Sequence, residues 1–346
     1  MRWISVGLLA LGHGLGDFNA GVVLASLGAH VGGDLVVLFL CYNTLAFAGQ
    51  PVVGWIADRA GSPLAWFLAG GVASAASLTF SGNDPWLAVV LSGVASAMYH
   101  SGGGAAAWML GRQSALAVGV FSAPGVLGLA LGLSIGSSLG FSATMGIAAA
   151  ILAVVFALAI LRRMIARAAP RAAHAPGDRR ALLGGIAGWV ILFAIAARSF
   201  AWTLGQDAIF PADAAVAIAV AAAIGKGVAG FLADKWGFES VAIGALGVAI
   251  CLLMLSRSWM ILLFPAAASL QAGTGPMMAL ALKAWPSRPA FASGLAQGLA
   301  VAVGGAPLFL MRERPKAPWL VAVALLAIAM LLVWRERRLK GGLDTI

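Results

Sequence analysis

The sequence contains little charge and little cysteine. Asp, Glu, Lys and Arg make up 10% of its 346 residues, while 62% of the residues are hydrophobic. Soluble domains carry about a quarter charged residues, so this composition excludes a soluble globule. The two cysteines, Cys41 and Cys251, stand far apart in apolar runs. We interpret them as small buried hydrophobic residues, and we expect neither a disulfide nor a metal site.

Motifs of metalloproteases and nucleotide hydrolases are also absent. The chain has no H-E-x-x-H and no G-x-x-x-x-G-K-[ST] sequence, which a zinc protease and a P-loop pump require. We therefore expect neither an enzyme nor a bound cofactor. An intramembrane enzyme would need a nucleophile and a base, and only Ser101 beside His100 offers such a pair.

Long hydrophobic runs recur along the whole chain. A bilayer core is crossed by roughly 20 apolar residues in helical form, and on that measure the sequence predicts an all-α membrane protein with twelve transmembrane helices. The predicted spans are residues 3–28, 35–57, 64–80, 86–110, 114–138, 142–161, 183–205, 212–233, 238–256, 259–282, 290–310 and 317–334.

A short segment at the end of the second span returns at the end of the eighth. The sequence GWIADRAG at 54–61 is matched by GFLADKWG at 230–237, and the same register aligns Gln50 with Lys226. A repeated membrane-edge loop indicates two similar bundles. We therefore predict two pseudo-symmetric six-helix bundles.

The boundaries of these bundles follow from the one long polar connection. Residues 1–161 form the first predicted bundle and residues 183–346 the second, and the connection at 162–182 is rich in Arg, Ala and Pro. Such a composition is typical of a flexible linker on the cytoplasmic side.

The distribution of basic residues predicts the orientation. With twelve spans both termini lie on one side, where the loops and ends carry sixteen Lys and Arg residues against four on the other. The positive-inside rule makes that side cytoplasmic. We expect an integral protein of a bacterial inner membrane with both termini in the cytoplasm. The net charge of +10 then reflects topology, and we expect a lipid bilayer as partner but no nucleic acid.

Two polar residues lie near the middle of the first span. His13 and Asp17 are one helical turn apart, so they share a face. A charge at this depth costs at least ~2.5 kcal/mol and usually marks a pathway. We interpret the pair as a proton carrier in which the imidazole tunes the carboxyl group. The alternative is a polar pair that holds two helices together.

Other polar and aromatic residues fall within the spans. Arg198 must meet a carboxylate, carbonyls or an anionic ligand, and Asp17 and Asp207 are its candidate partners. A structural salt bridge and a substrate anchor both remain open. Lys226 could instead extend its amine toward the cytoplasm, and His100 could be a satisfied core residue. The residues that we expect around a substrate cavity are Arg198, His100, Tyr99, Asn19, Trp202, Lys226 and Gln50.

The repeated loop resembles the signature of the major facilitator superfamily, G-x-x-x-D-R/K-x-G-R-R/K, although Ser62-Pro63 replaces its basic tail. The resemblance implies alternating access, with these loops clamping the cytoplasmic side. The implied gating residues are Gly54, Asp58, Arg59, Gly61, Gly230, Asp234, Lys235 and Gly237.

The first and fourth spans also resemble the fosmidomycin-resistance branch, through the H-x-x-x-D sequence at His13 and Asp17 and through Tyr99-His100. Ser101 stands where that branch has proline. This resemblance implies a proton-driven exporter of small molecules. In the fifth span, Pro124-Gly125 reverses the G-P of the superfamily's antiporters.

These observations together predict a proton-coupled secondary transporter that works as an efflux antiporter. Its partners would be protons and a small molecule that can carry negative charge, and it would work by alternating access. The main alternative is a membrane scaffold or sensor that keeps the transporter fold without transporting. Ligand-dependent conformational change would distinguish the two.

Overall fold

A computed structural model describes residues 2–27, 34–168, 179–311, 313 and 315–343 of the chain. Residues 169–178 of the predicted linker, and Arg312 and Arg314 before the last span, lie outside the described residues.

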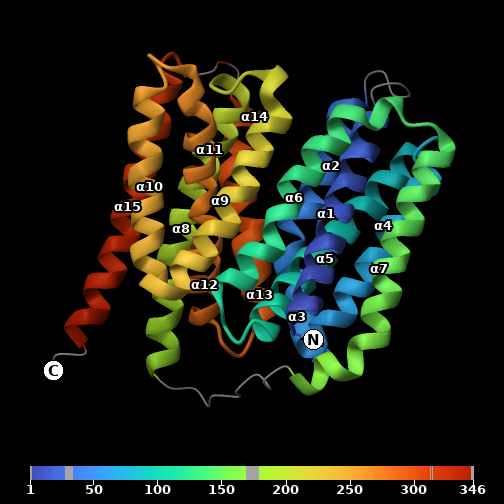
Figure 1. Cartoon of the computed structure of the whole chain (residues 1–346), viewed down its shortest axis with the longest axis horizontal. Coiled ribbons are helices and arrows are strands. Elements are labelled where there is room, and N and C mark those ends of the chain that lie inside the picture. The colour runs from blue at the N-terminus through green and yellow to red at the C-terminus, as the bar shows by residue number, and fades with distance from the viewer. Residues whose placement is uncertain (1, 28–33, 169–178, 312, 314, 344–346) are drawn as a thin grey trace. The chain divides into compact units, whose positions relative to one another are not determined.

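The described residues form helices along all twelve predicted spans (Figure 1). The prediction of an all-α membrane protein is confirmed, and long apolar runs bounded by Pro, Gly and polar residues explain where most helices begin and end. In the first half the helices are α1 (Arg2–Leu27), α2 (Leu35–Asn43), α3 (Gln50–Arg59), α4 (Pro63–Phe80), α5 (Pro85–Leu110), α6 (Ala115–Ile135) and α7 (Phe141–Ala168). In the second half they are α8 (Arg179–Ala208), α9 (Ala215–Trp236), α10 (Phe238–Leu255), α11 (Leu263–Ala272), α12 (Thr274–Ala284), α13 (Pro289–Gly294), α14 (Ala300–Leu310) and α15 (Pro318–Leu343).

Three of the spans consist of several pieces. A π-helical turn, η1 (Thr44–Ala48), joins α2 to α3, and a second, η5 (Leu295–Leu299), joins α13 to α14. The tenth span breaks between α11 and α12 at Gly273. Within the described residues, nine helices are long and apolar enough to cross a membrane. The Gly- and Ser-rich α5 and the interrupted tenth and eleventh spans complete the twelve.

The chain divides into two compact units. The first comprises Met1–Gln113, Val120–Arg171 and Arg288–Leu299, and the second comprises Ser114–Gly119, Ala172–Ser287 and Ala300–Ile346. Most of the first unit comes from the first half of the chain and most of the second from the second half, and two segments cross over. The first turns of α6 belong to the second unit, and α13 with η5 belongs to the first.

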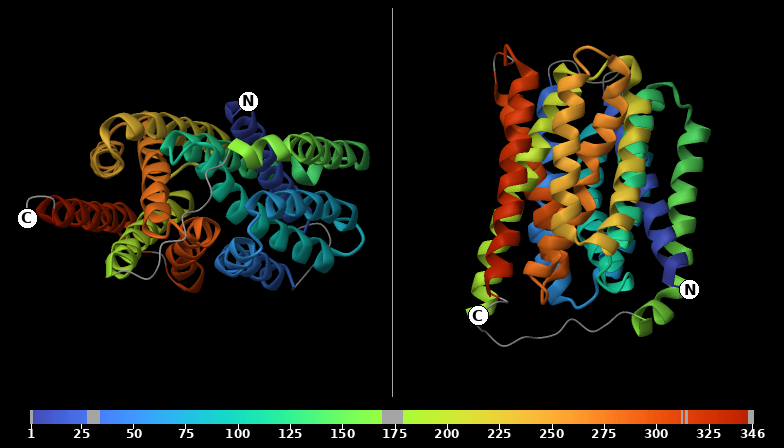
Figure 2. Two further views of the ribbon diagram at one scale, coloured as in Figure 1. Left: turned by 90° about the horizontal axis from the view of Figure 1, so that it is seen from below. Right: turned by 60° about the vertical axis from the view of Figure 1, so that its left-hand side comes forward.

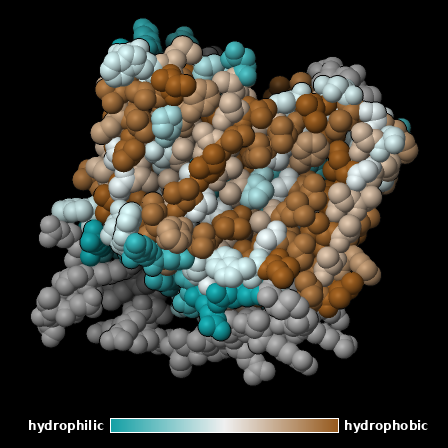
Figure 3. Space-filling view, in the orientation of Figure 1, coloured by the Kyte–Doolittle hydropathy of each residue, from teal (hydrophilic) through white to brown (hydrophobic). Residues whose placement is uncertain are grey.

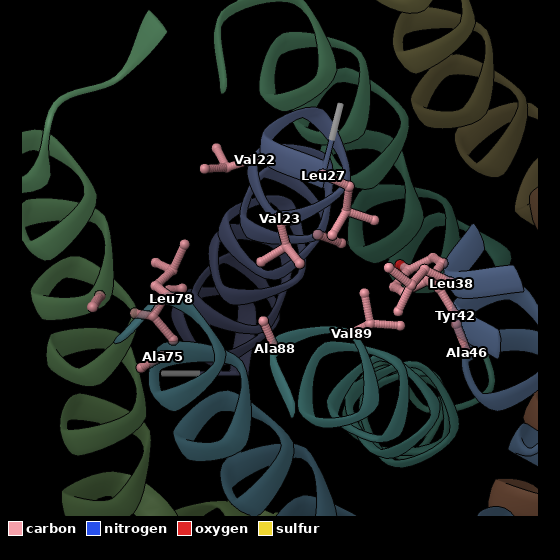
Figure 4. Packing of buried hydrophobic residues seen from close by; sticks show 13 residues of the cluster. Val22, Val23, Leu27, Leu38, Tyr42, Ala46, Ala75, Leu78, Ala88 and Val89 are labelled. Atoms are coloured by element: carbon pink, nitrogen blue, oxygen red, sulfur yellow. The ribbon is translucent and has the colours of Figure 1, made fainter. Parts of the chain in front are cut away.

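The first unit has a hydrophobic core where α1, α2, α4 and α5 meet. Figure 4 shows Val23 of α1, Leu38 of α2, Leu78 of α4 and Val89 of α5 pointing toward one another, and each is almost completely buried. A glycine of α6 adds a close helix contact, because Gly128 lies directly against the backbone of α1. Small residues at such positions let membrane helices approach closely.

The second unit is built around α8, against which α12, α14 and α15 pack, while α11 packs between α9 and α10. The helices of the second unit run in roughly one direction, as the right-hand view of Figure 2 shows. On the face drawn in Figure 3, hydrophobic side chains cover the lengths of the helices and hydrophilic ones gather at their ends. This distribution suits helices surrounded by lipid.

Candidate functional site

The first unit contains a buried cluster of polar side chains from α1 and α5. His13 Nε2 lies 3.3 Å from Asp17 Oδ2 on the next turn of α1. His100 of α5 contributes a second imidazole, with its Nε2 3.0 Å from that of His13 and 3.7 Å from Asp17 Oδ1. Tyr99 donates a hydrogen bond of 2.6 Å to Asp17 Oδ1. The three ionisable groups therefore meet at one point inside the bundle.

Backbone carbonyl groups determine which nitrogen of each imidazole carries hydrogen. His13 Nδ1 lies 2.7 Å from the carbonyl oxygen of Phe121, and His100 Nδ1 lies 2.9 Å from that of Ser96. A carbonyl oxygen only accepts, so both Nδ1 atoms must donate. In the neutral imidazoles both Nε2 atoms then carry lone pairs, which face each other and the carboxylate. The two lone pairs and the carboxylate therefore repel one another unless a proton or another cation lies between them.

The walls of this cluster are aromatic and tightly packed. The His13 ring stacks on Phe121 with ring centroids 4.5 Å apart, and Tyr99 stacks on His100 at 4.7 Å. Gly125 of α6 lies against the cluster: a Cβ there would lie 2.5 Å from Asp17 Oδ2 and 2.6 Å from His13 Cε1. The cluster therefore needs glycine at this position. The sequence offered only the Pro124-Gly125 pair as a signal for this role.

The backbone of His100 connects the cluster to the eleventh span. Ser293 Oγ and Gln297 Nε2 donate to the His100 carbonyl oxygen at 3.2 and 3.1 Å. Both donors lie on α13 and η5, within the first unit. Nothing in the sequence indicates this contact, because it joins residues almost two hundred positions apart.

Asn19 and Gln50 lie apart from this cluster, within helix contacts of the first unit. Asn19 Nδ2 donates to Ser74 and Ser77 of α4, and the residue is fully buried. Gln50 Nε2 donates to the carbonyl oxygen of Ala46 at 2.7 Å, and its backbone lies against Gly294. The side-chain oxygen atoms of both amides, Asn19 Oδ1 and Gln50 Oε1, are buried without a hydrogen-bond partner.

In the second unit, Arg198 is buried in α8 with 4% of its surface exposed. Its guanidinium donates to Gln271 Oε1 at 3.2 Å and to Ser199 Oγ at 3.3 Å, and its Nε has no partner. These hydrogen bonds join Arg198 to neutral side chains of its own unit. The candidate pairings with Asp17 and Asp207 stay predictions.

Trp202 and Lys226 complete the residues expected around a substrate. Trp202 packs on Phe210, with ring centroids 5.7 Å apart. Lys226 is half-buried in α9, and its backbone carbonyl faces Gly119 at the start of α6.

The acid of each repeated loop caps the beginning of another helix. Asp58 accepts hydrogen bonds from the backbone N–H groups of Ala290 and Phe291 at 2.9 and 2.8 Å, within the first unit. Asp234 accepts from the N–H groups of Ala115 and Leu116 at 2.6 and 3.2 Å, within the second unit. Ser114 Oγ also donates to Asp234. The N-terminus of a helix attracts a carboxylate through its free N–H groups and its dipole.

The glycines of the repeat permit these contacts. A Cβ at Gly54 would collide with the backbone of Ala290, and one at Gly230 would lie 2.8 Å from the Cα of Leu116. Gly61 and Gly237 end their helices with φ of +65° and +90°, a conformation that favours glycine. Arg59 stacks over Trp55 at 3.7 Å, and Lys235 lies 5.8 Å from the Trp236 ring. The two bases thus contact aromatic side chains of their own segments.

Comparison with known proteins identifies the fold. No family model and no curated protein sequence matches the chain. Solved structures do match over nearly the whole of both chains. The transporter FucP in its outward conformation has a TM-score of 0.74 at 13% identity, covering 97% of this chain and 98% of that one.

Two further structures have a TM-score of 0.66, and each match covers 96% of this chain and 99% of the other. They are a bacterial homologue of the iron transporter ferroportin, at 13% identity, and the human organic anion transporter MFSD10 (TETRAN), at 17%. The chain therefore has the fold of the major facilitator superfamily, twelve helices in two bundles.

Proposed function

We propose that the protein is a proton-coupled secondary transporter that exports a small anionic molecule in exchange for protons by alternating access. The observation that carries this proposal is the cluster of His13, Asp17 and His100. Its three acceptor groups converge in a buried place, and a bound proton would convert their mutual repulsion into hydrogen bonds.

Partial exposure of two of the three side chains also supports a proton site. The Asp17 side chain keeps 12% of its surface exposed and that of His100 keeps 11%, while His13 lies deeper at 3%. A proton could therefore enter at Asp17 or His100 and be shared with His13. Purely structural polar pairs in membrane helices need no such exposure.

The hydrogen bonds of the eleventh span offer a route from the cluster to a gate. The His100 carbonyl holds Ser293 and Gln297, while Asp58 holds the first turn of the same α13. A change in the position of His100 on protonation would therefore act on α13 directly. We propose that release of α13 from Asp58, and of the first turn of α6 from Asp234, opens the cytoplasmic side.

Arg198 supports the assignment of an anionic substrate. The guanidinium is always charged, and burying it without a carboxylate partner is costly. Gln271 and Ser199 satisfy two of its N–H groups but bring no negative charge. A carboxylate, phosphate or phosphonate would supply the missing charge. We place Trp202 and Lys226 near the same substrate and, from the motif in α1 and α5, the chain near the fosmidomycin-resistance branch.

The proposed location is a bacterial inner membrane with cytoplasmic termini. A cysteine introduced at Asn83, in the loop after the third span, or at Gln206, in the last turn of α8, should react with an impermeant maleimide added outside cells. A cysteine at Ala172 should not. Labelling at Ala172 from outside would reverse the orientation.

The test of coupling uses purified protein in vesicles. Organic carboxylates and phosphonates are first screened for thermal stabilisation, since a ligand that binds the folded state raises its melting temperature. Transport of the best ligand is then measured with and without a proton gradient. Asp17→Asn should abolish gradient-driven accumulation but keep ligand exchange, because the amide imitates the protonated acid. His13→Ala should shift the pH optimum of transport.

A matched control is Asp84→Asn, the same change in the same unit. Asp84 caps the start of α5 through Leu87 and contacts none of the cluster, so coupling should persist in this variant. A stable Asp17→Asn protein that still concentrates the ligand at the expense of the gradient would refute the proton-carrier assignment. Absence of any stabilising ligand or conformational change would favour the scaffold or sensor alternative.

A further inference from the structure

The dimensions of the His13, Asp17 and His100 cluster match those of a metal site. The Nε2 atoms of His13 and His100 lie 3.0 Å apart, and they lie 3.3 Å from Asp17 Oδ2 and 3.7 Å from Asp17 Oδ1, respectively. Ligands placed tetrahedrally at ~2.0–2.1 Å from Zn²⁺ lie roughly 3.3–3.4 Å from one another. The three groups thus already stand at nearly the separations that one small ion would impose. No other group of three such side chains within reach of one ion occurs among the described residues.

The hydrogen bonds around the cluster are those of metal ligands. A metal-binding histidine almost always donates its other ring N–H to a carbonyl or carboxylate, which orients the ring and makes its free nitrogen more basic. His13 and His100 both do so, to Phe121 and to Ser96. The carboxylate of Asp17 is held in turn by the hydroxyl group of Tyr99. All three ligand groups are therefore oriented before any ion arrives.

We propose that His13, Asp17 and His100 bind one divalent transition metal ion, with Zn²⁺, Co²⁺ and Ni²⁺ as the fitting class. Two imidazoles and one carboxylate suit these ions, whereas Mg²⁺ and Ca²⁺ prefer sites made wholly of oxygen. Three protein ligands leave a coordination position open to water or substrate. The sequence predicted no metal site, because only the folded chain brings His100 to the other two residues.

The metal site uses the residues of the proposed proton site but does not depend on transport. A metal ion and a proton would compete for the same lone pairs. Bound metal would therefore either block coupling or replace the proton as coupling ion. It would also bridge α1 and α5, whose contact at present consists partly of facing acceptors.

Equilibrium binding of Zn²⁺ to the purified full-length protein tests the proposal. The protein is prepared in detergent without a polyhistidine tag, treated with chelator, and titrated calorimetrically at slightly alkaline pH, where imidazole is neutral. We expect one Zn²⁺ per chain. Loss of an outer partner alone typically weakens metal binding 10–100-fold, so His100→Gln and His13→Gln should each weaken it by at least about 100-fold. His174→Gln, a change outside the described residues, is the matched control and should leave the affinity unchanged.

X-ray absorption of the Zn²⁺-loaded wild-type protein keeps the test decisive if the variants fail to fold. Its spectrum should show two imidazoles and one or two oxygen ligands. Absence of stoichiometric binding, a spectrum without two imidazoles, or full affinity in a folded His100→Gln variant would each overturn the proposal. Since the titration needs no gradient or substrate, its failure would leave proton-coupled transport standing, and failure of transport would leave the metal site standing.

Discussion

Replacing Asp58 should loosen the first turn of α13 by an amount that the structure allows us to estimate. The carboxylate accepts two backbone hydrogen bonds there, at 2.9 and 2.8 Å. Loss of a helix-capping side chain typically costs ~1 kcal/mol, and hydrogen bonds to charged groups are worth about 1.5–3 kcal/mol. We take the lower figure for each bond because Asp58 is only half-buried.

On this basis Asp58→Ala should destabilise the docked turn by ~2 kcal/mol and Asp58→Asn, which keeps one acceptor, by ~1 kcal/mol. Local opening would then increase about 30-fold and about 5-fold, since ~1.4 kcal/mol is a factor of ten. Hydrogen exchange of a peptide covering residues 288–299 measures this opening directly.

Asp84→Ala provides the matched control. Asp84 caps α5 through one bond to the N–H of Leu87, so this change should accelerate exchange at the start of α5 and leave residues 288–299 unchanged. Exchange of 288–299 that changes less than twofold in both Asp58 variants would refute the capping argument. Asp234→Ala should accelerate exchange at the start of α6 by a smaller factor, because Asp234 is exposed and solvent can replace it.

Two further changes test the two proposed binding places. Gly125→Ala should abolish coupled transport and lower the free energy of unfolding by about 1–3 kcal/mol, because its Cβ would overlap Asp17 and His13. Thermal unfolding and vesicle transport measure these two effects. Gly140→Ala is the control: Gly140 has open space around it, so this change should alter neither. Arg198→Met should raise the melting temperature, because it removes a buried charge without a compensating carboxylate. The variant should also lose stabilisation by anionic ligands. A lower melting temperature would indicate a structural ion pair instead.

The twelve spans could be predicted because their signal is local. Apolar runs of bilayer length are bounded by Pro63, Pro85, Pro289 and Pro318 at helix starts, and each helix satisfies its own backbone whatever its neighbours are. The pairing of His13 with Asp17 was accessible for the same reason, since residues four apart on one helix must be neighbours.

The remainder of the site depends on how the helices pack, which no local pattern encodes. The approach of His100 to His13 joins α1 to α5, and Gly125 matters only because α6 passes beside them. For Arg198, a charge-based argument favoured acidic partners, whereas the structure gives Gln271 across the bundle. A neutral amide in an apolar run offers no signal that distinguishes it from a packing residue.

The π-helical turn η1 has a consequence for the length of the second span. Gly49 N–H bonds to the carbonyl of Thr44, five residues back, so this turn holds one residue more than an α-helical turn. Beyond it, Gln50, Gly54 and Asp58 stand four residues apart and all face α13. Deleting one residue from 44–48 would restore a continuous α-helix and rotate this stripe by about 100°. The extra residue therefore sets the direction in which these three residues face along the rest of the second span.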